Sequence, residues 1–545
     1  MIKLRASFLT IIAFSVLAVM IFFGNNSCKK IKNPNAGTEI KDTIKYDYLK
    51  TRVFVQFFDA ATNENITQWD GDPLSVEVVG KSNMAVVDIL GNQEDRYYPQ
   101  NGFITFGILP EHVPSTSSPI TFTIVTDIYN HLSASKEITI TDDGDYFVKI
   151  PIINLEFPPE GVIVSTLSNV GNLYNGVVHD DVVISTDNSE AQVKVQAGTK
   201  LLGADSTSLT GKLNLILVYH KLDNDIGMST IQGGISSSIV KNNTTAGALF
   251  FPAGVIDLLI SDSDYKEAHS IEDKALEIKI TIPNGTYNSA TYSNYKSGDE
   301  LDVYTYLPDT GLWNYSKSVS VSANLQAVVY SSGLYSYNFS NKVSISCKEG
   351  AKFKTTGGCQ ECSSTVIDGV IRKNADDSFI SSLSLAATGD ETIYIPQRTG
   401  SAKVYIDWNE SSECNGCSVD PAFSHLDIDN MCTHPRQNLP LVDNGLVTTS
   451  ITGYFNGQCV SDTNYLILPS FGVWVRHMDS QCWQWTSMKL GEAQMCNLIY
   501  GETYMVATYF NNQWQEWEMT VIDDSDKYFT IIFTDAVCNE VFGIL

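Results

Sequence analysis

The sequence predicts an all-β protein made of tandem β-sandwich domains, with a disulfide-rich C-terminal part. Short runs in which every second residue is apolar recur along the chain, separated by turn residues at the spacing typical of sandwiches. The chain contains 26 Tyr and 24 Phe residues but shows little of the longer period expected for helices. Of its 11 cysteines, all but one lie from position 347 onward.

The N-terminal segment predicts export. Two basic residues precede an unbroken apolar run at positions 8–23, which has the length of a signal-peptide core rather than of a full membrane span. The following Ser27-Cys28-Lys29 resembles the cleavage site of a bacterial lipoprotein signal, in the relaxed form of Bacteroidetes-type envelope lipoproteins. This resemblance implies that residues 1–27 are removed and that Cys28 is lipidated. It also implies an outer-membrane lipoprotein that faces the periplasm or the cell surface. The alternatives are a cleaved signal without a lipid and an N-terminal membrane anchor.

Residues 28–47 are polar, lack an apolar period, and predict a flexible tether between the membrane and the first domain. The chain as a whole has a formal net charge of −27. This charge argues against nucleic acids and anionic lipid surfaces as partners, because both would repel the protein. We therefore expect contact with the membrane only through the N-terminal lipid.

Residues 48–157 predict the first β-sandwich. Val53, Val55 and Phe57 show the two-residue period of a strand, and similar runs follow. The segment 52–59 resembles the opening of the Ig-like or prealbumin-like modules of envelope lipoproteins.

A near-repeat links this domain to the end of the chain. Residues 137–147 (EITITDDGDYF) correspond to residues 518–529 (EMTVIDDSDKYF), and both predict a strand, an acidic turn and a second strand. Residues 438–545 are therefore expected to form a C-terminal Ig-like β-sandwich. Clustered carboxylates in these turns could hold calcium, but solvated turn aspartates are the preferred interpretation.

Tandem prolines at 158–159 mark a boundary, because proline cannot donate to a strand ladder. The following residues, 158–346, predict a second β-sandwich domain. Its apolar strands at 211–219 and 276–282 and its glycine turns resemble, in their order, the β-sandwich shared by netrin-receptor and ankyrin-type proteins. This resemblance implies an interaction or structural module without catalytic residues.

The cysteines predict disulfides. Six lie in residues 347–437, a Cys-rich β domain, and four in residues 438–545. Even counts in an exported chain indicate bonds that close separately within each block, although the pairing cannot be assigned. The candidates are Cys347, Cys359, Cys362, Cys414, Cys417, Cys432, Cys459, Cys482, Cys496 and Cys538.

The alternative for the first block is a zinc site. It would use the two CxxC pairs, Cys359 with Cys362 and Cys414 with Cys417, and either His425 or His434. The distance between the pairs exceeds that of a zinc ribbon, and export favours oxidation. We therefore expect neither a metal nor another cofactor.

The last domain is rich in tryptophan. Trp483 and Trp485 are two positions apart, so a strand would place both on one face. If exposed, the two rings could stack on sugar rings and bind a glycan. Otherwise they fill the core of the sandwich.

No nucleophile elbow, zinc-protease helix or phosphate-binding loop motif occurs in the chain. We therefore predict a lipid-anchored envelope protein with a non-catalytic binding or structural role, whose partner is a glycan or another envelope protein. One alternative is a glycan-binding accessory lipoprotein that uses Trp483 and Trp485. The other is a hydrolase whose site carries no sequence signature.

Overall fold

The prediction of an all-β chain is confirmed. The computed structural model describes residues 42–545 except 243, 309, 335, 346–350, 358–364, 388–391, 395–402, 409–416, 432–434, 436, 444–447, 463–464, 481–482, 511–512 and 543–545. In this part of the chain the helices are the short α2 (Asp225–Ser229) and α3 (Asp535–Glu540) and the 3-10 turns η1 (Asn83–Ala85) and η2 (Pro421–Phe423). None of these helices is long and apolar enough to span a bilayer.

The first module (residues 52–154) is a sandwich of two sheets whose inward side chains form one core. The five-stranded sheet contains, in order, β6 (Val86–Asp88), β7 (Phe103–Ile108), β2 (Arg52–Asp59), β11 (Asp145–Asn154) and β9 (His131–Leu132). The three-stranded sheet contains β10 (Ser135–Ile140), β8 (Ile120–Asp127) and β5 (Ser75–Val79), and a separate hairpin joins β3 (Gln68–Trp69) to β4 (Asp72–Pro73).

The second module (residues 162–345) packs a ten-stranded sheet on a four-stranded one. The large sheet contains β18 (Ser236–Lys241), β25 (Leu312–Ser320), β24 (Glu300–Leu307), β27 (Tyr337–Ile345), β19 (Thr244–Ser261), β17 (Gly211–His220), β12 (Val162–Tyr174), β13 (Val177–Val178), β16 (Lys200–Leu202) and β20 (Ser270–Glu272). The small sheet contains β14 (Val182–Ser185), β15 (Ala191–Val195), β21 (Leu276–Thr281) and β26 (Gln326–Ser331), and β22 (Tyr287–Asn288) pairs with β23 (Ser293–Asn294).

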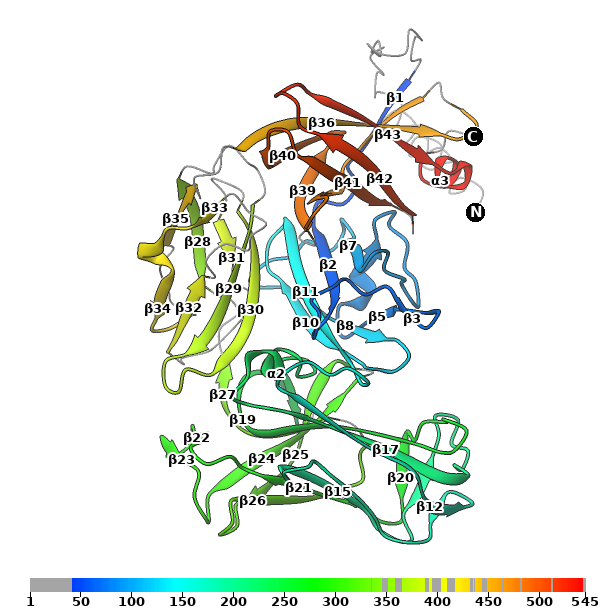
Figure 1. Cartoon of the computed structure of the whole chain (residues 1–545), viewed down its shortest axis with the longest axis vertical. Helices are drawn as coiled ribbons and strands as arrows, with labels where there is room; N and C mark the ends of the chain where they lie inside the picture. The colour runs from blue at the N-terminus through cyan, green and yellow to red at the C-terminus, as the bar shows by residue number, and fades with distance from the viewer. Residues whose placement is uncertain are drawn as a thin grey trace, which may run out of the picture.

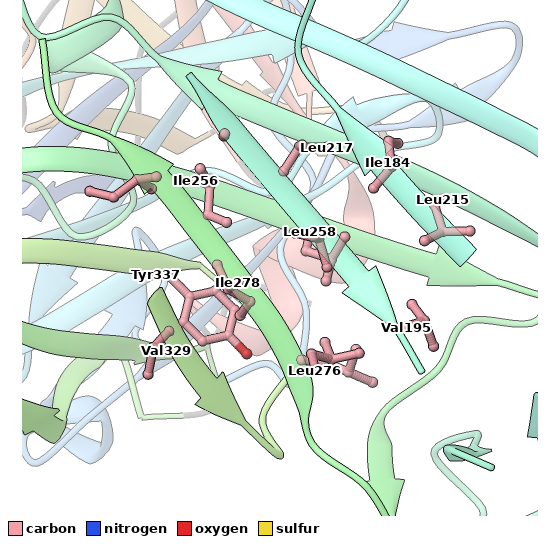
Figure 2. Packing of buried hydrophobic residues seen from close by; sticks show 14 of the residues in the cluster. Ile184, Val195, Leu215, Leu217, Ile256, Leu258, Leu276, Ile278, Val329 and Tyr337 are labelled. Carbon is pink, nitrogen blue, oxygen red and sulfur yellow. The ribbon is translucent and has the colours of Figure 1, made fainter. Parts of the chain in front are cut away.

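The core of the second module follows from the two-residue period of its strands. Leu217 and Ile256 of the large sheet face Ile278 and Val329 of the small sheet, as Figure 2 shows, and all four are at most 1% exposed. Burial of each such side chain stabilises the fold by roughly 1.5–3 kcal/mol.

The third module (residues 352–443) consists of two four-stranded sheets. One contains β31 (Thr392–Tyr394), β28 (Lys352–Gly357), β35 (Gln437–Asp443) and β33 (Cys417–Val419). The other contains β30 (Phe379–Ala387), β29 (Thr365–Lys373), β32 (Val404–Trp408) and β34 (His425–Ile428).

The fourth module (residues 448–540) also takes in a strand from the start of the chain. Its sheet runs through β1 (Asp42–Tyr46), β37 (Tyr465–Pro469), β36 (Thr448–Cys459), β40 (Glu492–Ile499), β39 (Trp483–Lys489), β38 (Gly472–His477), β41 (Thr503–Phe510) and β42 (Gln513–Thr520), and β43 (Lys527–Phe533) pairs with β36. Residues 42–46 had been predicted as part of the tether, but they form β1, which runs parallel to β37.

Three modules share one topological feature, because in each the first strand pairs in parallel with the last. The pairs are β2 with β11, β28 with β35, and β36 with β43. The near-repeat is part of this arrangement: β10 and β11 flank the first acidic turn, and β42 and β43 flank the second. The predicted strand, turn and strand are confirmed in both copies.

The modules pack into one body in which the first touches the other three. Figure 1 shows the fourth module at the top, the second at the bottom and the third at the left of the first. The Lys149 ammonium lies 3.0 Å from the Asp368 carboxylate, which joins the first module to the third. The Gly233 N–H donates to the Ser135 carbonyl at 3.1 Å, which joins the second module to the first.

The second and third modules share a continuous apolar core. Phe250 and Trp313 of the second module belong to the same buried cluster as Phe353 and Trp408 of the third. Arg372 of the third module adds an ion pair to Asp225 at the start of α2. An interface with a common core resists hinge motion, so these two modules are expected to move together.

Candidate functional site

The tryptophan pair of β39 lies between the fourth module and the first. Trp485 is 3% exposed, and its ring centroid lies 4.4 Å from that of Phe54. Trp483 is half-buried, with its ring centroid 6.1 Å from that of Phe103. Both rings thus contact the first module, as residues two apart on a strand can do. The pair does not form the exposed platform that the glycan hypothesis requires.

The cysteines are described only in part. Cys459 and Cys538 form a disulfide with Cα atoms 6.0 Å apart, and Cys496 is also disulfide-bonded. The side chains of the other candidates, Cys28, Cys347, Cys359, Cys362, Cys414, Cys417, Cys432 and Cys482, lie outside the described part.

The proposed zinc site is outside the described part in the same way, apart from His425. Nδ1 of this residue lies 2.7 Å from Oδ1 of Asp407. Within the described ranges no three His, Cys, Asp or Glu side chains are grouped as metal ligands.

The carboxylates of the two acidic turns accept hydrogen bonds from the protein itself. Thr51 donates to Asp143 at 2.8 Å, and Arg52 holds Asp145 through two hydrogen bonds of 2.8 Å. In the second turn, Asp524 accepts from the hydroxyl groups of two side chains, and these bonds lower its pKa. The aspartates therefore fix the turns to neighbouring strands, as turn aspartates often do.

A buried histidine lies between α2 and the large sheet of the second module. Nε2 of His220 lies 2.6 Å from Oδ2 of Asp257, and Nδ1 lies 3.1 Å from Oγ1 of Thr230. The order of these groups is that of a catalytic triad, but His220 is 0% exposed. This network therefore ties α2 to β17 and β19 and offers no reactive group to solvent.

A cavity of about 880 Å³ lies where the modules meet. Its walls include Lys136 and Lys149 of the first module, Ser237 of the second and Asp368 of the third. Burial lowers the pKa of the Lys136 ammonium. Because Lys149 and Asp368 pair across the cavity wall, the cavity belongs to the junction that holds the modules together.

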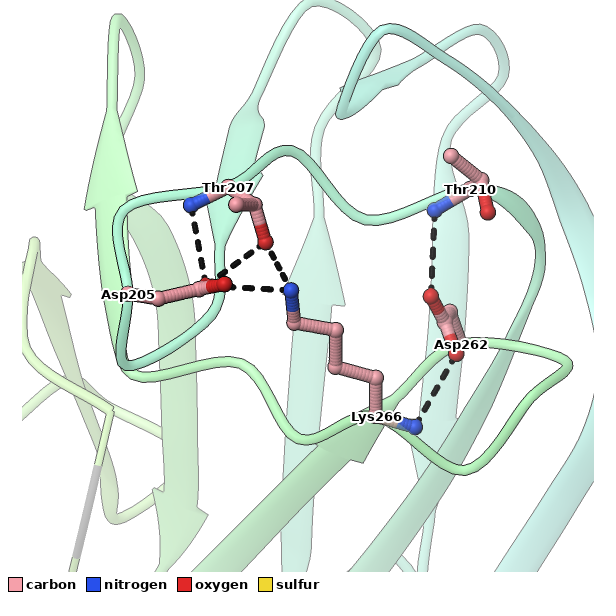
Figure 3. Close-up of polar contacts among 5 residues, drawn as sticks. All are labelled: Asp205, Thr207, Thr210, Asp262 and Lys266. Carbon is pink, nitrogen blue, oxygen red and sulfur yellow. Dashed lines mark hydrogen bonds and ion pairs between the residues drawn. The ribbon is translucent and has the colours of Figure 1, made fainter.

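Three loops meet at one end of the second module, and we call residues 174–176, 203–210 and 262–267 the distal loops. Asp262, which is 2% exposed, joins two of them, as Figure 3 shows. One of its carboxylate oxygens accepts the N–H of Lys266 at 3.0 Å, and the other accepts the N–H of Thr210 at 3.1 Å. The buried carboxylate thus joins two loops that are more than 50 residues apart in sequence.

A second set of contacts closes the same loops at the surface. The Lys266 ammonium lies 3.0 Å from Oδ1 of Asp205 and also contacts the Thr207 hydroxyl (Figure 3). The hydrogen bond from Thr207, followed by that from Lys266, lowers the pKa of Asp205. The carbonyl of Gly176 in the third loop accepts the N–H of Leu201 at 2.8 Å, which joins this loop to β16, the strand that leads into residues 203–210.

These fixed loops present two aromatic side chains to solvent. Tyr174 is 70% exposed and Tyr265 is 78% exposed. Tyr265 has a φ of 59°, which is unusual for a bulky residue and costs conformational energy. The neighbouring residues Asp264 and Lys266 both donate their N–H groups to Asp262, which holds the loop in this conformation.

Sequence reasoning did not identify the distal loops as a binding surface. The only local signals are the turn Asn175-Gly176 after Tyr174 and the run of polar residues 261–264 before Tyr265. Neither signal indicates that the two loops lie at the same end of the module, because this depends on the pairing of β16 with β13 and β20.

Comparisons with known proteins place the chain in no family. No family profile matches the sequence, and no curated protein matches it. Solved structures with distant similarity include Gram-positive pilus proteins of the tandem β-sandwich type. They include the shaft pilin SpaA of Lactobacillus rhamnosus GG, with 8% identity over 34% of this chain and 97% of that one, and a TM-score of 0.17.

Two further structures cover more of the chain. The full-length major pilin RrgB of Streptococcus pneumoniae has 8% identity over 89% of this chain and 99% of that one, with a TM-score of 0.12. The pilus-presented adhesin Spy0125 (Cpa) has 7% identity over 72% of this chain and 99% of that one, with a TM-score of 0.14.

Proposed function

We propose that this protein is a lipid-anchored, non-catalytic protein of the cell envelope that holds its distal loops away from the membrane for binding. The observation that carries the proposal is the position of β1. The predicted anchor, Cys28, precedes the start of β1 by 14 positions, and β1 is paired to the fourth module. In Figure 1 this module and the strands β12 and β20, which lead to the distal loops, lie at opposite ends of the long axis.

The packing between the modules supports the same role. A spacer must keep its far end at a fixed distance, and the shared core of the second and third modules and the contacts of the first module provide that rigidity. The exposed rings of Tyr174 and Tyr265 then supply a surface of the kind enriched at binding sites.

The arrangement on the membrane can be measured directly. A fluorophore is attached at position 265 or at position 460, both highly exposed, in lipidated full-length protein on vesicles that contain a quenching lipid. We expect strong quenching at position 460 in the fourth module and little at position 265. Equal quenching at both positions would contradict the proposed orientation.

The binding role is tested on the loops themselves. In a double variant, Tyr174→Ala and Tyr265→Ala, retention of protein-coated beads on glycan-coated surfaces should fall about tenfold, since a stacked aromatic contact contributes roughly 0.5–1.5 kcal/mol. Tyr292→Ala is the matched control, because this residue is 83% exposed, has a φ of 54° and lies outside the distal loops. If retention of the control variant falls as much as that of the double variant, the distal loops are not the binding surface.

A further inference from the structure

Strand β1 is the outermost strand of the fourth module's sheet and comes from a distant part of the chain. Its five residues pair in parallel with β37, from Asp42 with Tyr465 to Tyr46 with Pro469. Among the described residues β37 makes a single ladder pair on its other side, between Gly457 and Ile467. Most of the strand pairing of β37 therefore comes from β1.

Loss of β1 would expose a template for another strand. Leu466 and Ile467 of β37 are 6% and 0% exposed, and their backbone groups would lose their partners on one side. An unpaired edge next to a buried apolar surface readily accepts an extended segment. The site beside β37 thus requires an occupant.

The side chains of β1 are only partly buried, although Ile44 and Tyr46 pack against the core of the fourth module. Thr43, Ile44 and Tyr46 are half-buried and Lys45 is exposed, so none of these four side chains is fully buried. The strongest contacts are those of Tyr46, whose hydroxyl donates to the carbonyl of Ile89 at 2.9 Å. Parallel pairing is also slightly less stable per residue than antiparallel pairing.

Only a short segment connects β1 to the first module. Residues 47–51 span the gap to the strand β2, and Leu49 in the middle of them is 5% exposed. Leu49 therefore holds the connection at one point, and the residues on its N-terminal side can pair with another copy, as in proteins that exchange identical elements.

We propose that β1 is an exchangeable strand and that the site beside β37 accepts residues 42–46 of a second copy of this chain. Every copy carries both the strand and the site, so exchange can close a dimer or link copies into a chain. In a single copy the short connection favours β1 of the same chain, because it gives an effective concentration in the millimolar range. Pairing with β1 of another copy therefore prevails where the protein is concentrated, or where the connection is too short for β1 to reach β37 of its own chain.

Shortening the connection tests this proposal. Deletion of Tyr48 and Lys50 from the mature chain, residues 28–545, shortens the reach by about 7 Å. We expect the mass measured by light scattering to double or to increase further. Insertion of Gly-Ser-Gly-Ser after Asp47 is the control and should leave the protein monomeric. Addition of Ile44→Asp to the shortened variant should also restore the monomer, because the strand can no longer dock.

A monomeric shortened variant with a protease-sensitive β1, or an oligomer that persists with Ile44→Asp, would overturn the proposal. A second measurement uses the chain that starts at residue 47 and a synthetic peptide of residues 38–50. The folded protein should bind this peptide at a ratio of one to one and should not bind the peptide with Ile44→Asp. Absence of binding to the folded protein would likewise overturn the proposal.

Discussion

Lys373 ends β29 with its ammonium group 3.9 Å from the ring centroid of Phe251, at the interface of the second and third modules. The residue is 2% exposed, and burial lowers the pKa of the ammonium from 10.5 to about 8. The attraction to the aromatic ring offsets only part of the cost of removing the charge from water. At neutral pH this lysine therefore destabilises the folded protein.

The pH dependence follows from the two pKa values. Between about pH 8 and pH 10.5 the unfolded chain binds a proton at Lys373 that the folded protein has released, so the free energy of unfolding rises with pH in this window. Below pH 8 Lys373 is protonated in both the folded and the unfolded state. Its burial then lowers the free energy of unfolding by the full amount of about 3 kcal/mol. Lys373→Met should raise the unfolding midpoint at pH 7 and remove the rise above pH 8. Thermal unfolding measured at pH 7 and pH 10 checks this, with the exposed Lys212→Met as a control that should change neither.

The tryptophans of β39 lead to a second prediction. Because Trp485 is buried against Phe54, Trp485→Ala should reduce the free energy of unfolding by roughly 3–5 kcal/mol. Trp483→Ala removes a half-buried ring and should cost only about 1–2 kcal/mol. Urea unfolding of both variants provides the comparison. Equal costs for the two variants would show that Trp485 does not fill the interface as described.

The strand alternation predicted that both rings lie on one face, but it could not predict what covers that face. The residue that covers the rings, Phe54, could have been recognised as buried from the sequence of β2. Val53, Val55 and Phe57 face the core of the first module, and Phe54 adds an apolar residue on the opposite face of β2. On that face Phe54 and Phe58 alternate with Arg52 and Gln56, and two bulky aromatic rings on a second face indicate a second covering surface. The sequence could therefore predict that β2 has a second neighbour, although not which one.

At the level of the elements, local patterns predicted well and pairing between distant segments did not. The near-repeat predicted a strand, an acidic turn and a strand in both copies, because turn aspartates and alternation act within a dozen residues. The parallel pairing of β11 with β2 and of β43 with β36 depends on segments that are far apart, which no local period encodes. For the same reason the sequence predicts a tether where the structure has β1. Five residues without a strong apolar period do not indicate which distant strand they pair with.

The disulfide between β36 and α3 provides a prediction for one element. Cys459 and Cys538 are 79 residues apart, and a cross-link that closes a loop of this length stabilises by about 4–5 kcal/mol in the chain-entropy account. Replacement of both cysteines by alanine should lower the unfolding temperature of the fourth module. It should leave the shared core of the second and third modules unchanged. Calorimetry that resolves separate transitions checks both statements, and a shift of every transition together would mean that the modules unfold as a single unit.

The arrangement of the modules in the whole molecule differs more from the sequence-based expectation than any single element does. The predicted boundaries and tandem domains suggest modules that do not pack against one another. In the structure the first module contacts the other three, and the aromatic cluster of Phe54, Phe103, Trp474 and Trp485 joins the two ends of the chain. Modules related in sequence at the two ends can pack side by side only if the modules between them turn back. This turn is a property of the interfaces and is not visible in any single segment.

A variant in this cluster tests whether the modules form one body in solution. Phe103 is 0% exposed and its ring centroid lies 4.0 Å from that of Trp474, so Phe103→Asp would bury a carboxylate without a partner between the first and fourth modules. Burial of an unpaired charge costs several kcal/mol, so the modules should separate. We expect small-angle X-ray scattering to give the radius of gyration of the structure for the native chain and a larger value for Phe103→Asp. Tyr528→Asp, at a 51% exposed position of β43, should leave the radius of gyration unchanged. A native chain that already scatters as an extended string would refute the single body, and with it the fixed distance between the anchor and the distal loops.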